Sequence, residues 1–344
     1  MDNIQIVNWP LTRRCNLDCG YCRIIRDYHE MPKEYPNMGY YYSNEMDTNF
    51  VIMILKRLKL HNPNCFHIFY GGEPILRKDL PEIINYCNKN DIIYTIITNI
   101  TDGVQPMVEA LIDSTDRVMG LSSSVDPLVV NDKSDTARLM KSTAGLNKLP
   151  QYGGVINDLV AEVTIDSRNV EHIYETVKKL SDLKINSSVN FIDIAKSPYY
   201  DFSNVTDKSL LVHRSTELKN QLDRIVQDGL DVHMAKTLFP LIWKILPSNL
   251  DCGIENDIHN LCIDSDDAVR LCLRIRGVGT PSMKVDDLID SNGNLDLGIK
   301  KFYEADKKAY CMGCNHTCMI MSKLLVEDEN LIGEQHHSDK RRNE

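Results

Sequence analysis

The stretch that decides the fold is residues 15–22, which read Cys-Asn-Leu-Asp-Cys-Gly-Tyr-Cys. Its cysteines, Cys15, Cys19 and Cys22, have a C-x3-C-x2-C spacing. Three thiolates on one loop can hold three irons of a [4Fe–4S] cluster, and the fourth iron stays open because the usual protein set is four Cys. A structural zinc site is the alternative, but such sites normally close with a nearby fourth ligand, and the next candidate is His29. The loop therefore favours an iron–sulfur cluster with one open iron.

Outward from this loop, short apolar runs alternate with helical periodicity from residue 4 to about residue 200. The runs predict strands at 4–9, 65–70, 92–98, 118–123, 159–165 and 185–194, and helices at 43–60, 80–88, 104–113, 136–147 and 170–183. Ser43 and Asp79 are the expected N-caps of the first two helices. Repeated βα units predict an α/β fold in which a parallel sheet curls into a partial (β/α)6 barrel. The functional sites should then lie at the C-terminal ends of the strands.

A second motif, Gly71-Gly72-Glu73-Pro74, directly follows the second predicted strand. Paired glycines let a backbone come close to a ligand, and the Glu73 carboxylate suits an ammonium group. Alone, the motif could be an ordinary strand-to-helix turn. Placed after the second strand and downstream of the cysteine loop, it indicates a ligand site.

The cysteine loop, with Tyr21 before its third Cys, and the GGEP motif together resemble the radical S-adenosylmethionine (SAM) superfamily over residues 4 to about 200. The resemblance implies that the amino and carboxylate groups of SAM chelate the open iron. Electron transfer from the cluster then cleaves SAM to a 5′-deoxyadenosyl radical. The GGEP motif would contact the methionine amino group.

The resemblance also implies cofactor contacts at the ends of the later strands. Ser124 and Asp126 match an S-x-D ending, whose hydroxyl could bond the ribose or carboxylate of SAM. Arg168 would pair with that carboxylate, for which a guanidinium is well suited, and Asn190 would line the adenine. Purely local roles in turns and caps remain open for each. The expected cofactor-binding residues are Tyr21, Gly71, Gly72, Glu73, Pro74, Thr98, Asn99, Ser124, Asp126, Arg168 and Asn190.

Six of the eleven cysteines lie in the last hundred residues, in a layout similar to a SPASM or shorter twitch extension, which binds auxiliary iron–sulfur clusters. The cysteines are fewer than in a full SPASM domain, which favours one four-Cys auxiliary [4Fe–4S] cluster, although two remain open. Segment 262–272 is expected to form a hairpin, and a zinc ribbon is the alternative. The expected ligands are Cys272, Cys311 and Cys314, with Cys252 or Cys262 as the fourth and Cys318 as a further candidate. Cys65 and Cys87 are expected core residues.

Amino-acid composition restricts the possible classes of protein. The chain has 344 residues, 42% of them hydrophobic, and a net charge of −10, which argues against nucleic-acid binding. No signal peptide or membrane-spanning stretch is visible, and the cysteine usage suggests a reducing compartment, so a cytoplasmic location is expected. The expected domains are a barrel at 1–200, a helical bridge at 201–250, an auxiliary-cluster domain at 251–330 and a disordered tail at 331–344. Within the bridge, helices are expected at 210–227 and 234–245.

The resemblance implies an enzyme that abstracts a hydrogen atom from an unactivated carbon and draws electrons from a partner such as flavodoxin or ferredoxin. Oxidation or cross-linking in the maturation of a ribosomal peptide is favoured, because SPASM and twitch members so often act on peptides. Dehydrogenation of a small carbinol or sugar stays open, since no N-terminal peptide-recognition domain is visible. Epimerisation would need a hydrogen donor, for which Cys318 or Cys252 could serve. The non-enzyme alternatives are an iron–sulfur SAM-binding sensor and a zinc-bearing module.

Overall fold

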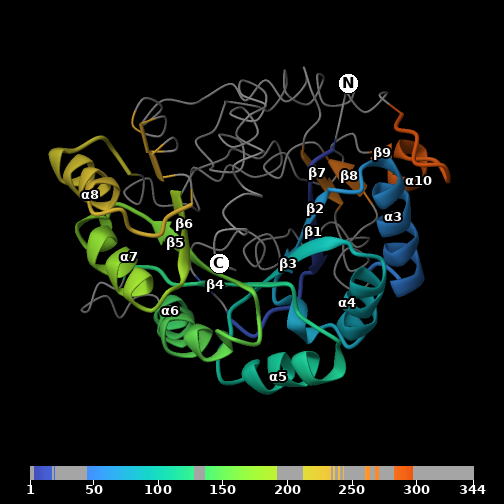
Figure 1. The fold of residues 1–344 in the computed structure, drawn as a ribbon, viewed down its shortest axis with the longest axis horizontal. Coiled ribbons are helices and arrows are strands. Elements are labelled where there is room, and N and C mark those ends of the chain that lie inside the picture. Colours follow the sequence, from blue (N-terminus) through green and yellow to red (C-terminus); the bar gives the residue numbers. More distant parts are fainter. Residues whose placement is uncertain are drawn as a thin grey trace, which may run out of the picture.

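A curved sheet with helices along its outer face forms the described part of the molecule (Figure 1). The computed structural model describes residues 4–17, 19, 45–127, 136–191, 212–233, 235–236, 239–240, 243, 260–263, 268–270 and 283–296. The strands are β1 (Ile6–Thr12), β2 (Phe66–Gly71), β3 (Ile93–Thr98), β4 (Gly120–Ser124), β5 (Asp158–Ile165), β6 (Asn186–Phe191), β7 (Asn260–Ile263), β8 (Ala268–Arg270) and β9 (Met283–Lys284).

The spatial order of the strands is β6-β5-β4-β3-β2-β1-β7-β8-β9. Every neighbouring pair from β6 to β7 is parallel, and β8 and β9 are added antiparallel. The predicted α/β class and the six βα-derived strands are confirmed. The sequence patterns missed β7 as a seventh parallel strand in the described sheet.

Helices cover the outer face of this sheet (Figure 1). They are α3 (Thr48–His61), α4 (Leu80–Lys89), α5 (Gln105–Ser114), α6 (Thr136–Lys148), α7 (Ile173–Asp182), α8 (Thr216–Gln227) and α10 (Val285–Leu288), with 3₁₀ turns η2 (Pro74–Leu76), η3 (Leu149–Tyr152) and η4 (Val170–His172). Their spacing follows the predicted βα alternation. Ser215 caps α8 by accepting from the Leu218 N–H, so this helix begins later than the predicted residue 210. The predicted helix at 234–245 falls largely outside the described residues.

Two predicted helix caps were wrong in their details. Helix α3 starts after Asp47, whose carboxylate accepts from the backbone N–H groups of Asn49 and Phe50, whereas Ser43 lies outside the described residues. Asp79 does occupy the N-cap position of α4, but its side chain bonds no helix N–H. Its carboxylate is held instead by Arg77, through a 3.0 Å bond from Nε, and by the Thr48 hydroxyl. A charged partner close in space thus replaces the local cap.

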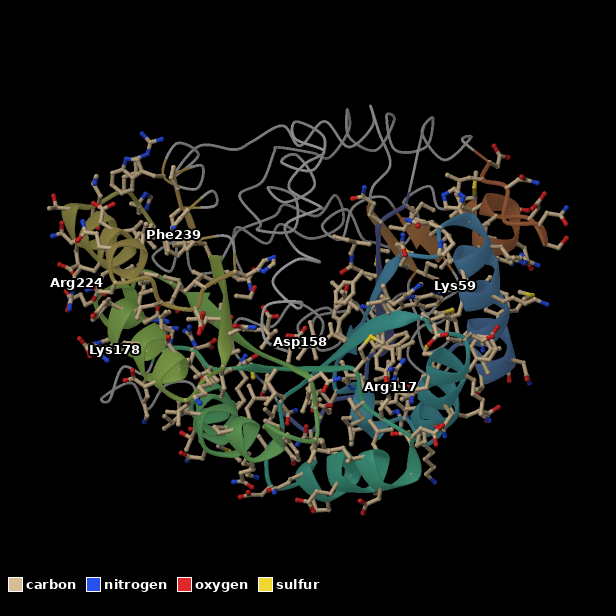
Figure 2. All side chains as sticks on the ribbon, in the orientation of Figure 1. Lys59, Arg117, Asp158, Lys178, Arg224 and Phe239 are labelled. Atoms are coloured by element: carbon tan, nitrogen blue, oxygen red, sulfur yellow. The ribbon has the colours of Figure 1, made fainter. Side chains whose placement is uncertain are left out.

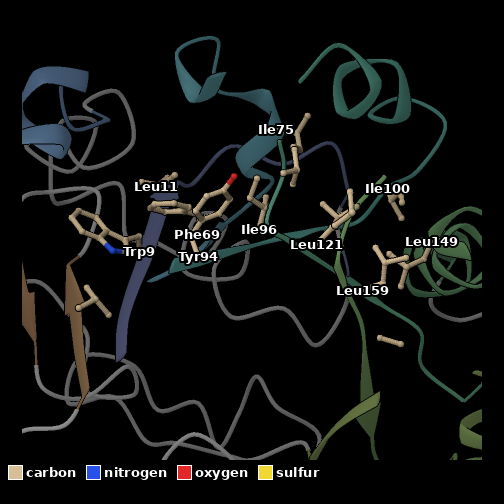
Figure 3. Packing of buried hydrophobic residues seen from close by; sticks show 14 of the residues in the cluster. Trp9, Leu11, Phe69, Ile75, Tyr94, Ile96, Ile100, Leu121, Leu149 and Leu159 are labelled. Atoms are coloured by element: carbon tan, nitrogen blue, oxygen red, sulfur yellow. The ribbon is translucent and has the colours of Figure 1, made fainter. Parts of the chain in front are cut away.

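The core lies between the sheet and its helices, because strand side chains alternate between the two faces. On the outer face, Trp9, Phe69, Tyr94 and Leu121 are buried in one continuous cluster (Figure 3). The predicted core thiols Cys65 and Cys87 are also buried, which confirms that part of the sequence reading. The inner face, opposite the helices, carries the alternate residues of each strand.

Strand β7 joins the late part of the chain to the barrel. It pairs in parallel with β1, so that Asn8 lies opposite Cys262, and the Asn8 side chain donates to the Leu261 carbonyl at 3.4 Å. The antiparallel pairing of β7 with β8 is the hairpin expected after Cys262. Helix α10 is fixed to α3 by a 2.6 Å bond from Arg57 to Asp286. The predicted domain boundary at residue 250 stays a prediction, and the 331–344 tail lies outside the described residues.

A buried Trp9–His67 pair in the outer face makes stability depend on pH. Trp9 Nε1 donates to His67 Nδ1 at 3.0 Å, and burial lowers the pKa of His67 from 6.5 to about 3. Between those values the unfolded chain takes up a proton that the folded chain does not, so stability should fall as the pH drops below about 6.5. The slope should be at most about 1.4 kcal/mol per pH unit.

The variant His67→Gln should lose this slope while its side-chain oxygen still accepts from Trp9. Urea unfolding of both proteins at about pH 7 and about pH 5 measures the difference. Equal pH dependence in the two proteins would contradict the assignment to His67.

No helix in the described part of the chain is long and apolar enough to cross a membrane.

Candidate cofactor site at the ends of the parallel strands

The cysteine loop leaves the sheet at the end of β1. Cys15 is partly buried, and its sulfur accepts from the Leu17 backbone N–H at 3.4 Å. Cys19 is buried. Cys22 and Tyr21, the other two motif residues expected at the cofactor, lie outside the described residues. The described cysteines therefore sit at the C-terminal end of the first parallel strand, where the sequence placed the cluster.

The GGEP motif docks on the backbone of residues 12–14, which lead from β1 into the cysteine loop. The Gly72 N–H donates to the Thr12 carbonyl and the Glu73 N–H to the Arg14 carbonyl, both at 2.7 Å. A Cβ atom on Gly72 would lie 2.2 Å from the Arg14 carbonyl oxygen. We expected these glycines to admit a ligand, but the close contacts in the structure are with the backbone of residues 12–14, directly before the cysteine loop.

Replacing Gly72 by Ala should therefore disturb the loop. A Cβ at that position meets backbone atoms that cannot rotate away, so we expect a loss of about 1–3 kcal/mol in unfolding free energy and less bound iron per chain. Gly103→Ala is the matched control, since its Cβ would make an ordinary 3.6 Å contact with the Asn16 amide. Chemical denaturation and iron analysis of both variants measure the effect. Equal iron content and stability in the two variants would contradict the close-contact argument.

Glu73 links this turn to the end of β3. One carboxylate oxygen accepts from the Asn99 N–H at 2.7 Å and the other from the Ile75 N–H at 3.1 Å. Burial raises the pKa of Glu73 to about 7, while these bonds and one from Thr98 act in the opposite direction. Pro74 begins the η2 turn directly after it. The predicted contact between Glu73 and an ammonium group stays a prediction; its visible role is to join two strand ends.

Asn99 ties β3 to the cysteine loop. Its amide Nδ2 donates to Asn16 Oδ1 at 2.7 Å and lies 4.0 Å from the Cys15 sulfur. Asn16 in turn donates to the Thr101 hydroxyl at 2.9 Å. Amide groups beside a cluster thiolate stabilise it and tune its potential, so this surrounding suits an iron–sulfur ligand. The sequence reading missed Asn16 and Thr101, although Asn16 lies inside the cysteine motif itself.

Asp126, predicted as a cofactor contact, is buried in an ion-pair network. Its carboxylate accepts from Arg138 Nε at 2.8 Å and from the Thr164 N–H at 3.0 Å, with the Lys141 ammonium 3.8 Å away. Burial alone would raise the pKa of Asp126, but Lys141 and Arg138 outweigh it and hold the pKa below its ordinary value. Arg138 also bonds Asp166, so one guanidinium bridges the ends of β4 and β5.

Arg168 follows β5, as predicted, and its guanidinium is bonded to Asp166 at 2.7 Å. The Asp166 pKa is held below its ordinary value, because hydrogen bonds and charges from Arg168 and Arg138 outweigh the effect of burial. The predicted pairing of Arg168 with a SAM carboxylate stays a prediction. The sequence reading missed Arg138, because it lies on α6 and nothing local marks its two partners.

Ser124 and Asn190 face the inner side of the sheet, on either side of β5. Ser124 is the register partner of Glu162, and Asn190 donates to the Glu162 carboxylate at 2.8 Å. Glu162 is a further site residue that the sequence reading missed, since it looked like one polar position in an alternating strand. The structure brings these residues together within the parallel sheet.

Among the predicted auxiliary-cluster ligands, Cys262 is described and is buried in β7. The other predicted ligands, Cys252, Cys272, Cys311, Cys314 and Cys318, lie outside the described residues. The auxiliary cluster and its ligand set therefore stay predictions.

A family model described as the radical SAM superfamily matches residues 9–196. The chain belongs to the radical SAM superfamily. Two curated relatives are a PqqA peptide cyclase of Xanthomonas oryzae pv. oryzae (strain MAFF 311018) and an Fe-coproporphyrin III synthase of Methanosarcina barkeri (strain Fusaro / DSM 804). The peptide cyclase is 24% identical over a match that covers 62% of this chain and 53% of the cyclase. The synthase is 28% identical over a match that covers 54% of this chain and 43% of the synthase. The chain spans about half the length of the curated relatives it matches.

Two solved structures are similar in fold. SuiB of Streptococcus suis, bound to the precursor peptide SuiA, has a TM-score of 0.57 at 15% identity, covering 88% of this chain and 66% of SuiB. The protein anSMEcpe, with bound AdoMet and the Cp18Cys peptide, has a TM-score of 0.57 at 14% identity, covering 97% of this chain and 99% of that one. At these identities the likeness establishes the shared fold.

Proposed function

We propose that this radical SAM protein is an enzyme that cleaves SAM reductively and removes a hydrogen atom from a peptide substrate. The observation that carries the proposal is the anchoring of the cysteine loop. Main-chain bonds to Gly72 and Glu73 and the Asn16–Asn99 bond fix the loop against two strand ends. Such pre-organisation is what a site must supply when a cofactor carries the chemistry.

Cys15, Cys19 and Cys22 would hold a [4Fe–4S] cluster, and the strand ends near Glu73, Ser124 and Arg168 would hold SAM. When bound, these groups supply the electron and the 5′-deoxyadenosyl radical that attacks the substrate. The chain's own part is to orient them. Asn99 and the Leu17 N–H surround the Cys15 sulfur, and Glu73 fixes the end of β3 beside the loop.

A peptide substrate is favoured by the names of the similar proteins. PqqA peptide cyclase is named for a peptide, and the SuiB and anSMEcpe structures hold peptides. Oxidation or cross-linking is the proposed outcome, with one auxiliary [4Fe–4S] cluster held by late cysteines and a flavodoxin or ferredoxin as electron donor. Fe-coproporphyrin III synthase is named for a porphyrin, so the test also includes a small-molecule outcome.

The test is SAM turnover by the anaerobically reconstituted protein, with dithionite as reductant. The 5′-deoxyadenosine is quantified without substrate and with synthetic peptides encoded beside the gene. Turnover that rises with one peptide, which loses two hydrogen atoms by mass, supports the proposal. An unchanged mass with solvent deuterium at one carbon would indicate epimerisation instead. Stimulation by a carbinol or sugar but by no peptide would overturn the peptide assignment, and reduced protein that never forms 5′-deoxyadenosine would overturn the enzyme assignment.

A further inference from the structure

We propose that Glu162, with its neighbours on the inner face of β4–β6, binds a cationic group of the substrate, a primary ammonium or a guanidinium. The inference rests on the proposed function, because the cationic group belongs to the substrate of that enzyme. The polar cluster consists of Ser124, Glu162, Ser188 and Asn190.

The backbone register places this cluster on one face. Ser124 of β4, Glu162 of β5 and Ser188 of β6 are direct register partners, and Asn190 lies opposite Thr164, one inward position further along. In β5 the residues Leu159, Ala161 and Val163 are buried against the helices, so Glu162 points to the opposite, inner side. The cluster therefore lies toward the C-terminal ends of the parallel strands, at the height of Ser124, the last residue of β4.

The Glu162 carboxylate has hydrogen-bond donors but no cation among the described residues. Asn190 donates to it at 2.8 Å, and the Ser188 hydroxyl also bonds it. Asp126 and Asp166, two buried carboxylates at these strand ends, each contact at least one guanidinium. Glu162 is half-buried, and partial removal of a carboxylate from water without a counter-charge is costly, so a ligand cation would relieve that cost.

The ionisation of Glu162 agrees with this geometry. Burial raises its pKa to about 7, against the effect of the Ser188 and Asn190 bonds, and Asp158 on the same face raises it further. Asp158, labelled in Figure 2, lies four residues before Glu162 on the same strand. The side chains that face Glu162 from β4 and β6 are the neutral Ser122, Ser124, Asn186, Ser188 and Asn190. Beyond β6, the backbone of His233 bonds the Ser187 carbonyl.

The Ser188 hydroxyl lies directly across from Glu162 on β6 and bonds its carboxylate. An ammonium group beside Glu162 could use this neutral hydroxyl oxygen as a second acceptor. The cluster thus offers a charged acceptor and a neutral one, which matches the several N–H donors of an ammonium or guanidinium.

The test follows the Glu162 carboxyl directly, by isotope-edited infrared titration of reconstituted protein carrying ¹³C-labelled glutamate. Subtracting the Glu162→Gln spectrum isolates the signal. The probe is n-butylammonium, with KCl at equal ionic strength as the control. A bound cation stabilises the charged carboxylate, so butylammonium should lower the Glu162 pKa by about one unit, a tenfold preference for the ionised form. No shift beyond that in KCl would overturn the inference.

SAM also carries an ammonium group, so the titration is run with and without it. A butylammonium shift that persists in SAM-loaded protein supports the assignment to the substrate. If SAM alone lowers the Glu162 pKa and butylammonium lowers it no further, the assignment to the substrate is overturned. Glu171→Gln is the matched control variant, because Glu171 is exposed on η4 and its removal should leave the Glu162 signal unchanged.

The same samples separate this inference from the proposed function. If wild-type protein forms 5′-deoxyadenosine but the pKa of its Glu162 carboxyl does not respond to butylammonium, the cation site fails and the enzyme assignment stands. If no sample forms 5′-deoxyadenosine, the enzyme assignment fails, and the titration still decides the cation site.

Discussion

Replacing Cys15 by Ala should abolish SAM cleavage and lower the iron content by about four atoms per chain, the complement of one cube. Cys15 lies where the loop leaves β1, and its sulfur is surrounded by the Leu17 N–H and the Asn99 amide. With only two cysteines left in the loop, the cube would lose a corner that no described side chain can replace. Iron and sulfide analysis, with quantification of 5′-deoxyadenosine, measures the loss.

Cys65→Ala is the control for that experiment. Cys65 is buried, and burial raises the pKa of its thiol to about 12, so it stays protonated and is a poor iron ligand. Its removal should leave iron content and SAM cleavage unchanged. Full iron content in Cys15→Ala, or an equal loss in Cys65→Ala, would disprove the assignment of the loop.

Replacing Arg138 by Met should destabilise the protein by about 3–5 kcal/mol, the usual result of removing one partner from a buried ion pair. Arg138 is buried and bridges Asp126 to Asp166, so its loss leaves two carboxylates short of a counter-charge. Methionine keeps much of the volume. Urea unfolding of the two proteins at neutral pH measures the difference.

The effect should depend on pH in a defined direction. The pKa values of Asp126 and Asp166 are held below 3.8 in the folded protein, so their ionisation contributes stability at neutral pH that is lost as the pH falls through those values. The gap between wild type and Arg138→Met should therefore shrink in acid. The control is Arg117→Met, whose contact with Asp91 is exposed and 3.6 Å long, and which should cost less than about 1 kcal/mol. Equal losses at the two positions would contradict the bridge.

The sequence could predict strands and helices whose hydrophobic residues recur with a regular period. It could also predict motifs whose residues are contiguous in the chain. Strands such as β3 and β5 are read from apolar runs, and the cysteine loop and GGEP motif are contiguous. The parallel pairing of β7 with β1 could not be predicted, because four residues carry no periodic signal and Cys262 already suggested a metal ligand. That pairing depends on the edge of β1, which is far away in sequence.

The same limit applies to the site. The sequence located Asp126 at a strand end but could not tell that Arg138 engages both Asp126 and Asp166, because those pairings join α6 to two different strand ends. Gly72 was predicted to let the backbone come close to a ligand, and the close contact in the structure is with the backbone of Arg14. The sequence shows which positions carry a charged or a small side chain. Which residue each of them contacts is decided by the fold.

The pairing of β7 with β1 has a consequence for the order of events during synthesis. Asn8 and Leu261 are 253 residues apart, so the first strand leaves the ribosome long before its neighbour exists. At about 5–20 residues per second, the β1 edge next to the cysteine loop waits roughly 13–50 s for its partner. During that interval an unpaired parallel edge is exposed to other nascent chains. Completion of the sheet would therefore wait until β7 has been synthesised, well after the strands β2 to β6.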